Sequence, residues 1–317
     1  MQMKIIQGRY DMITMKHYSF VSKDGVTIKG ICMIPEKPVA ILQMVHGMNE
    51  HKERYLGFME KMAEKGYVTL MHDNRGHGES IKDEDDLGYC YGLLDKGMVE
   101  DVYTATVRIK KRYPDLPLIL YGHSMGSLIV RSFLKKHDDV IDGLIVAGSP
   151  SYQRAVPYGR ILVETMMKLK GDRYRSKLVS KLAVGSFNKP FLSEKRQYAW
   201  LTTDVAVSEA FINDPLCSYV YTLNGYLTLL NLETAVYKEK DYNLKNANLP
   251  ILFISGENDP CKVNDKKWSN SMEILRRAGY KNVSGITYEG MRHEIHNEPD
   301  KQLVFNEIDR FCTVCRC

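Results

Sequence analysis

The chain lacks any apolar stretch long enough to cross a membrane, which excludes a transmembrane helix among its 317 residues. Residues 1–20 contain Lys4, Arg9, Asp11 and Lys16 and lack the continuous apolar core of a signal peptide. Internal repeats and low-complexity segments are also missing. These absences predict a soluble, cytoplasmic protein.

Charge of one sign is not concentrated anywhere in the sequence. The net charge is +5 and the isoelectric point is about 8.6, with no long basic run. This pattern gives no support for nucleic-acid binding. A mildly basic protein has at most a weak, salt-sensitive attraction to anionic lipid surfaces or substrates. We therefore expect at most transient contact with a membrane surface, and the sequence leaves the oligomeric state open.

The cysteines do not form a disulfide framework, because there are seven of them and they are scattered. Reduced thiols are the expected state. Cys312, Cys315 and Cys317 form a C-x-x-C-x-C tail that lacks a second half with zinc-site spacing. We expect no metal and no cofactor, and whether oxidation of Cys261 tunes activity stays open.

Apolar segments and helical patterns alternate along most of the chain. The apolar fraction is 44% and the charged fraction 26%, as in an ordinary globular protein with a large core. A hairpin is predicted over 18–34, with its turn at Asp24-Gly25. Helices are expected at about 52–65 and 97–113. This alternation predicts an α/β fold with a mostly parallel, eight-stranded sheet covered by helices on both faces; the other strands are 40–45, 67–72, 118–121, 141–147, 250–254 and 283–288.

The alternation stops between residues 151 and 241, where helical patterns appear at 161–169, 176–182 and 216–232. We interpret 151–241 as a helical cap inserted between two parts of one core, 1–150 and 242–317. Its apolar residues either line a substrate tunnel or pack the small core of the cap. They are Met166, Met167, Phe187, Phe191, Tyr198, Trp200, Phe211, Tyr219, Tyr221 and Tyr226.

The segment Gly122-His123-Ser124-Met125-Gly126 reads G-x-S-x-G and carries the strongest chemical signal. It follows the apolar run 118–121 and precedes the helix-compatible stretch 128–134, which is the context of a nucleophile elbow. The glycines have no Cβ, so Gly122 and Gly126 allow a sharp turn to close. Ser124 is therefore the candidate nucleophile, at a helix N-terminus that favours developing negative charge.

An acid and a base follow Ser124 in the order Ser…Asp…His. Asp259 comes after the predicted strand 250–254, and Asp265 is a weaker rival because it is expected on the next helix. His293 lies in the loop after the last strand, and His296 is its rival. The pair His293 and His296 does not have the spacing of a zinc-binding H-E-x-x-H motif, which argues against a metal role.

The loop after strand 40–45 is the expected second half of an oxyanion hole. It begins with His46 and Gly47 and continues to His51. We assign the backbone N–H groups of Met48 and Met125 as the two donors, since such holes combine a donor after the nucleophile with one from this loop. Loss of one donor typically costs about 3 kcal/mol of transition-state stabilisation.

Four segments together resemble the bacterial lysophospholipase and monoacylglycerol lipase branch of the α/β-hydrolase superfamily, which shares its sequence class with serine aminopeptidase-like hydrolases. They are the loop 46–51, the D-x-R-G-H-G-x-S loop 73–80, the elbow 122–126 and the histidine loop 289–294. The resemblance covers nearly the whole chain, including 200–201 and 214–217 in the expected cap. It implies Ser124 as nucleophile, Asp259 as acid, His293 as base, an acyl-binding pocket under a cap, and no cofactor. Met48 departs from the small residue common at its position.

These features predict a serine hydrolase that cleaves carboxylic esters of lipid-like substrates through an acyl-enzyme on Ser124. Monoacylglycerols, lysophospholipids and short or medium acyl esters are the expected substrates. One alternative is a serine aminopeptidase, which would need an acidic pocket for the free amine, with Glu209 and Asp214 as candidates. A binding protein without turnover on the same fold is the remaining alternative.

Overall fold

The computed structural model describes residues 3–7 and 12–316. Arg9 and Asp11 of the charged N-terminal stretch, and Cys317 of the cysteine tail, lie outside the described residues. No helix within 3–7 and 12–316 combines the length and the apolar character that crossing a bilayer requires.

One twisted sheet runs through the described part of the chain, with the strand order β1-β2-β3-β5-β4-β6-β7-β8-β9. The first three strands pair antiparallel, and so do β3 and β5, whereas the pairs from β5 to β9 are parallel. All eight predicted strands are present. A ninth, β1, was not predicted and pairs with β2 at the sheet edge. The bounds are β1 Met3–Gln7, β2 Met12–Val21, β3 Thr27–Ile34, β4 Ala40–Val45, β5 Tyr67–His72, β6 Leu118–His123, β7 Gly143–Ala147, β8 Ile251–Gly256 and β9 Val283–Tyr288.

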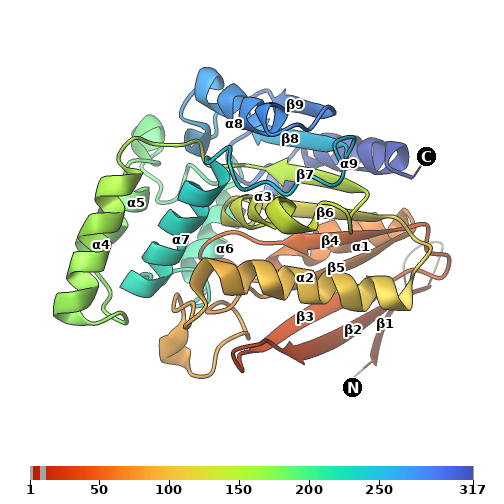
Figure 1. Cartoon of the computed structure of the whole chain (residues 1–317), viewed down its shortest axis with the longest axis horizontal. Helices are drawn as coiled ribbons and strands as arrows, with labels where there is room; N and C mark the ends of the chain where they lie inside the picture. The colour runs from red at the N-terminus through yellow and green to blue at the C-terminus, as the bar shows by residue number, and fades with distance from the viewer. Residues whose placement is uncertain (1–2, 8–11, 317) are drawn as a thin grey trace.

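Helices cover both faces of the sheet (Figure 1). Two apolar cores result: one contains side chains of α2, α3 and α8, and the other contains side chains of α1 and α9. The strands β4 to β8 are buried along their whole length, as expected for parallel strands covered on both sides. The bounds are α1 Leu56–Glu64, α2 Leu94–Arg112, α3 Met125–His137, α8 Asp265–Arg277 and α9 Lys301–Val314.

Four helices lie between β7 and β8 in the sequence and stand beyond one end of the sheet, on the left of Figure 1. They are α4 Val156–Lys170, α5 Lys177–Val184, α6 Val205–Asn213 and α7 Leu223–Val236. Helix α4 contains the predicted segment 161–169, and α5 contains all of the predicted segment 176–182 except its N-cap, Ser176. The predicted helix 216–232 was wrong at its start, because the Thr222 side chain accepts a hydrogen bond from the Gly225 N–H and caps α7 there.

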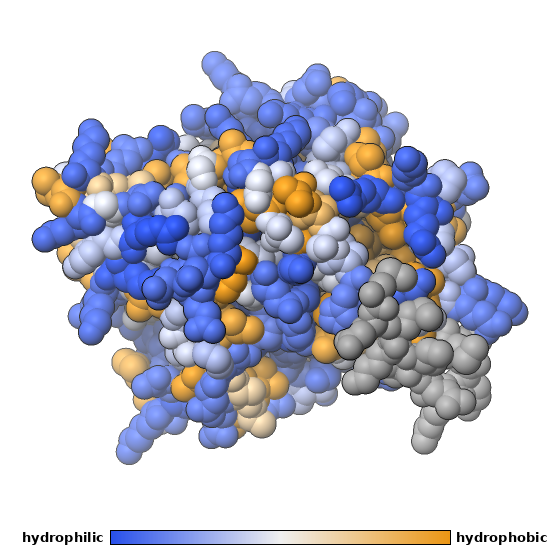
Figure 2. Space-filling view, turned by 90° about the horizontal axis from the view of Figure 1, so that it is seen from below, coloured by the Kyte–Doolittle hydropathy of each residue, from blue (hydrophilic) through white to orange (hydrophobic). Residues whose placement is uncertain are grey.

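Helix α6 was not predicted, although Asp204 gave a usable signal. Its side chain accepts hydrogen bonds from the N–H groups of Ala206 and Val207, as an N-cap does. The face of the molecule seen in Figure 2 is mostly hydrophilic, with apolar side chains in small, separate groups.

Candidate active site

Ser124 lies at the turn between β6 and α3, with φ of 53° and ψ of −119°. A positive φ is strained for a residue with a side chain, and such strain persists only where the surrounding structure holds it. Two close approaches hold it here. A Cβ on Gly126 would lie 2.2 Å from the Val45 carbonyl oxygen, and one on Gly122 would lie 2.5 Å from the Gly126 oxygen. The turn therefore requires glycine at both positions.

The structure brings Ser124, His293 and Asp259 together from three separate loops. His293 Nε2 lies 2.9 Å from Ser124 Oγ, and His293 Nδ1 lies 3.0 Å from each carboxylate oxygen of Asp259. His293 and Asp259 are almost completely buried. The carboxylate also accepts a hydrogen bond from the Cys261 N–H at 2.8 Å. Burial by itself would raise the pKa of Asp259, but His293 and these hydrogen bonds outweigh it and lower that pKa.

Neither rival residue reaches Ser124. Asp265 begins α8, where its exposed carboxylate pairs with Lys262 at 2.8 Å. His296 is buried and its ring stacks on Tyr55, with 4.5 Å between the ring centroids. Neither ring nitrogen of His296 has a hydrogen-bond partner within the described residues, and burial together with His123 lowers its pKa to about 3. His296 is therefore a neutral packing residue.

The loop after β4 lies against Ser124. A Cβ on Gly47 would lie 2.9 Å from the Cβ of Ser124. His46 fixes the loop: its Nε2 accepts from the Asn74 N–H at 2.9 Å, so its Nδ1 carries the proton and donates to the Gly47 oxygen at 2.8 Å. In the described part of the chain, the N–H groups of Met48 and Met125 have no acceptor. Two N–H groups without an acceptor among these residues thus belong to the elbow and to the loop that contacts it.

Sequence reasoning missed a buried pair that supports this geometry, Glu50 and His123. The Glu50 carboxylate accepts from the Gly47 N–H at 2.6 Å and from the Tyr55 hydroxyl at 3.0 Å, and lies 3.1 Å from His123 Nδ1. The other ring nitrogen of His123 lies 3.1 Å from the backbone oxygen of His293. Each residue lies inside a motif that the sequence shows: Glu50 in the loop after β4, and His123 next to Ser124. These positions were the sequence signal from which the pair could have been suspected.

Because both ring nitrogens of His123 face acceptors, the imidazole favours its doubly protonated, charged form. Burial alone would lower the pKa of His123, but the Glu50 carboxylate outweighs burial and raises it. Burial alone would raise the pKa of Glu50, and His123 followed by Arg54 brings it well below its usual range. The two form a buried ion pair that connects the loop of Gly47 to the loop of His293.

A second buried ion pair attaches the His293 loop to the rest of the site. The Arg54 guanidinium binds both oxygens of Glu294 at 2.8 Å and one oxygen of Glu50 at 3.0 Å. The Glu294 N–H donates to the Leu201 oxygen at 2.7 Å. The ring of Trp200 lies 4.9 Å from that of His293, centroid to centroid. The loop of His293 is thus held from the segment after β4 and from the segment before α6.

The loop 73–80 has a supporting role. Asp73 accepts from the Lys52 N–H at 2.8 Å and pairs with the Lys52 ammonium at 2.7 Å. Arg75, fully buried, pairs with Asp101 at 2.8 Å. Burial lowers the pKa of His77 to about 4, and its ring bonds to the Tyr221 hydroxyl. These contacts fix the strand end beside the oxyanion loop.

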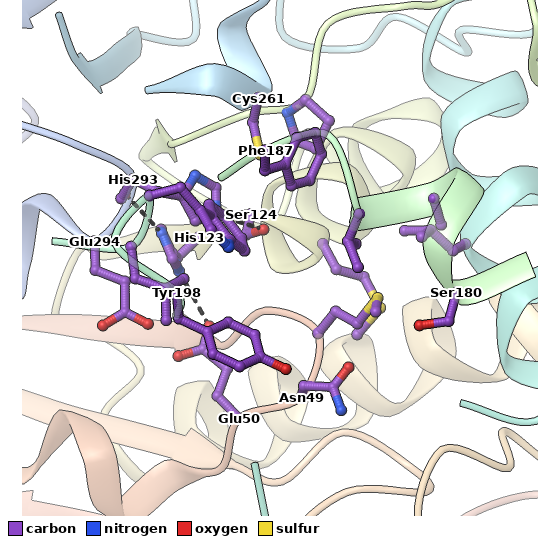
Figure 3. Close-up of a pocket in the computed structure, with 18 of the residues that line it drawn as sticks. Asn49, Glu50, His123, Ser124, Ser180, Phe187, Tyr198, Cys261, His293 and Glu294 are labelled. Atoms are coloured by element: carbon purple, nitrogen blue, oxygen red, sulfur yellow. Dashed lines mark hydrogen bonds and ion pairs between the residues drawn. The ribbon is translucent and has the colours of Figure 1, made fainter. Parts of the chain in front are cut away.

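A cavity lined mainly by apolar side chains opens at Ser124 (Figure 3). Its wall combines the β4 loop, the elbow and residues from the segment between β7 and β8. Six of the ten candidate tunnel residues line it, namely Phe187, Tyr198, Trp200, Phe211, Tyr219 and Tyr226. Met166, Met167 and Tyr221 instead belong to a small apolar core around α4, α5 and α7. Some of these residues therefore line the cavity at Ser124, and others pack a local core; use of the cavity as a substrate tunnel stays a prediction.

Three groups in the described residues bring ligand-type side chains together, but none presents three deprotonated donors. They are Glu50-His123-His296, His51-Asp214-Cys217 and Asp259-Cys261-His293. Burial raises the pKa of the Cys217 and Cys261 thiols, which keeps both protonated. In the first group, His123 carries its proton against Glu50. These donor sets do not favour a metal ion.

Comparison with known families decides the affiliation. The model of the family described as "Serine aminopeptidase, S33" matches residues 36–300. The chain belongs to this family. The chain is similar to the monoacylglycerol lipase of Mycolicibacterium smegmatis, which is 24% identical over 297 residues covering 93% of this chain and 96% of the relative. The phospholipase YtpA of Bacillus subtilis is 26% identical over 281 residues, covering 87% of this chain and 96% of the relative.

A solved structure agrees with this assignment. The carboxyl esterase of Bacillus coagulans, crystallised with glycerol, superimposes with a TM-score of 0.88 at 25% identity, covering 96% of this chain and 99% of the esterase. The predicted α/β-hydrolase fold and the predicted monoacylglycerol lipase-like family are confirmed.

Proposed function

We propose that the protein is a serine hydrolase that cleaves carboxylic esters of lipid-like substrates through an acyl-enzyme on Ser124. The observation that carries the proposal is the hydrogen-bonded chain from Ser124 Oγ to His293 Nε2 and from His293 Nδ1 to Asp259. Lipase and esterase names among the relatives support the ester class.

The hydrogen-bond pattern defines the proton path. The buried Asp259 carboxylate accepts from His293 Nδ1–H, so the Nε2 lone pair accepts the Ser124 proton. Ser124 Oγ then attacks the carbonyl carbon, and the negative charge forms on an oxygen between the N–H groups of Met48 and Met125. His293 passes the proton to the leaving alcohol. Water then attacks the acyl-enzyme, with His293 again the base, and releases the acid.

The substrate class follows from the cavity. Residues 151–241 act in this proposal as a cap inserted between core parts 1–150 and 242–317. An aromatic and aliphatic wall beside Ser124 suits an alkyl chain, since burial of each CH₂ group contributes about 0.8 kcal/mol. Monoacylglycerols, lysophospholipids and medium-chain esters meet this requirement. No step in the mechanism uses a cofactor.

Transient contact with a membrane surface remains a prediction, and α4 and α5 present the side chains that suit it. Tyr158, Ile161 and Leu169 on α4 are exposed, as are Leu178 and Leu182 on α5. Apolar side chains on an amphipathic helix near the substrate cavity favour reversible contact with lipid.

The aminopeptidase alternative has less support from the site. Glu209 is exposed on α6, and Asp214 pairs with His51 at 2.7 Å; neither lines the cavity. Glu50 and Glu294 do line it, but they are bound to His123 and Arg54. A substrate ammonium would have to displace an existing partner of either carboxylate.

Hydrolysis of p-nitrophenyl esters of graded chain length tests the proposal. We expect turnover by the wild type and a loss of about 10⁴-fold or more in Ser124→Ala, because the nucleophile is removed. Ser269→Ala, at an exposed position on α8, is the matched control and keeps wild-type turnover. Undiminished hydrolysis by a folded Ser124→Ala variant contradicts the assignment. Failure of a fluorophosphonate probe to label the wild type would instead favour a binding protein.

A further inference from the structure

The cavity at Ser124 adjoins a second cavity between α4, α5 and α7. The two share five lining residues, Gln153, Ala183, Tyr226, Leu229 and Glu233. Most of the second wall is aliphatic, including Val156, Leu162, Val163, Val179, Leu182 and Leu230. A substrate chain that leaves Ser124 in this direction therefore passes the shared residues before it reaches the second cavity.

Glu233 is the exception in this shared wall, because it carries a carboxyl group among apolar neighbours. Its side chain is half-buried and accepts one long hydrogen bond, from the Gln153 N–H at 3.3 Å. In the part of the chain that the structure describes, no cation lies within ion-pair distance of it. Burial raises the pKa of Glu233 to about 7, although Arg131 and Lys267 act from a distance in the opposite direction. The carboxyl group is thus poorly satisfied by the protein.

Ser151 is a second polar residue that lines the cavity at Ser124. Its side chain is 1% exposed, and its hydroxyl has no hydrogen-bond partner among the described residues. Ser151 lines the cavity at Ser124 and is two residues from Gln153, whose N–H contacts Glu233. Of these two groups, only the half-buried Glu233 carboxyl group lies on the wall that both cavities share, and most of that wall is apolar.

An unsubstituted alkyl chain in this passage would displace water from the Glu233 carboxyl group and offer no hydrogen bond in its place, which is costly. A chain with a hydroxyl group at this level would donate to the Glu233 carboxyl group. We propose that this stretch is a binding site for a hydroxyl group on the acyl chain, so that the protein prefers hydroxylated acyl esters over unsubstituted ones of equal length. The inference rests on the proposed ester hydrolysis at Ser124.

The test compares 1-monooctadecanoylglycerol with a set of its monohydroxylated analogues, in which the hydroxyl group moves along the chain. The measured quantity is the ratio of kcat/KM for each analogue to that for the unsubstituted ester. We expect the wild type to show a ratio of about ten at one or a few neighbouring positions, since one satisfied polar group is worth about that much. Equal rates at every position would overturn the proposal.

One variant assigns the preference to Glu233. Glu233→Leu is expected to bring the ratio to about one, whereas Glu209→Leu on the exposed face of α6 keeps it. A ratio that survives in the folded Glu233→Leu protein would also overturn the proposal. Both results differ from failure of the proposed function, in which the wild type hydrolyses neither these esters nor p-nitrophenyl butyrate.

Discussion

Glu50→Gln is the change that tests how the site is held together. The Glu50 side chain is 3% exposed and contacts the Gly47 N–H, the Tyr55 hydroxyl, Arg54 and His123. Glutamine keeps one acceptor oxygen for the Gly47 N–H. That oxygen also faces the Tyr55 hydroxyl and His123 Nδ1, whereas the NH₂ group replaces the oxygen that accepts from Arg54 and cannot accept. The substitution also removes the negative charge, so a protonated His123 is left without its anion.

Removal of one member of a buried ion pair typically costs 3–5 kcal/mol, roughly. Here His123 relieves part of that cost by losing its proton, because burial without Glu50 lowers its pKa. We therefore expect a loss of about 3 kcal/mol in the free energy of unfolding at pH 6. For a chain of 317 residues this corresponds to a fall in Tm of roughly 5 °C.

Activity is expected to fall as well, because the Gly47 N–H contact positions the loop that carries the Met48 donor. Complete loss of one oxyanion donor costs about 3 kcal/mol, so a displaced loop should lower kcat/KM by about 10- to 100-fold. Urea unfolding followed by circular dichroism, and hydrolysis of p-nitrophenyl butyrate, measure the two effects.

The control for Glu50→Gln is Glu164→Gln, which removes an exposed ion pair with Arg160 on α4 and should change stability by less than about 0.5 kcal/mol. If Glu50→Gln unfolds at the same urea concentration as the wild type and hydrolyses the ester at the same rate, the argument that Glu50 and His123 hold the site is refuted.

Three further outcomes are expected. Asp259→Asn should lower kcat by about 10⁴-fold with little change in KM, because an amide donor at His293 Nδ1 favours the tautomer that cannot accept the Ser124 proton; equal kcat would contradict this. Gly126→Ala should cost about 1–3 kcal/mol of stability, measured by urea unfolding, because its Cβ meets the Val45 oxygen. The free energy of unfolding should fall as pH drops below about 6.5, by roughly 2 kcal/mol per group at pH 5. The reason is that certain buried histidines stay neutral in the folded protein but become protonated in the unfolded chain. A urea midpoint that does not change with pH would contradict this. These histidines are His72 and His77, each with a pKa of about 4, and His296, with a pKa of about 3.

Local sequence patterns were sufficient for the strands and the elbow. The apolar runs of β4 to β8 are short, bounded by turn residues and buried on both faces. Each run therefore predicts a strand from its own residues, without information from the rest of the chain. The elbow requires glycine at two positions because a Cβ there would meet backbone atoms of the same turn or of the end of β4. This requirement is also visible in the local sequence. Strand β1 was not predicted, because an edge strand of five residues carries little periodicity and takes its conformation from pairing with β2.

Only the tertiary structure decided which polar groups meet. The sequence favoured His293 over its rival His296, and the fold places the first against Ser124 and stacks the second on Tyr55. Glu50 and His123 are 73 residues apart, so no local pattern reveals their ion pair. The sequence alone predicted most of the elements and proposed Ser124 as the nucleophile. The packing of distant loops decided the charge, the orientation and the neighbours of the polar side chains around Ser124. These properties depend on contacts between residues that are far apart in the sequence.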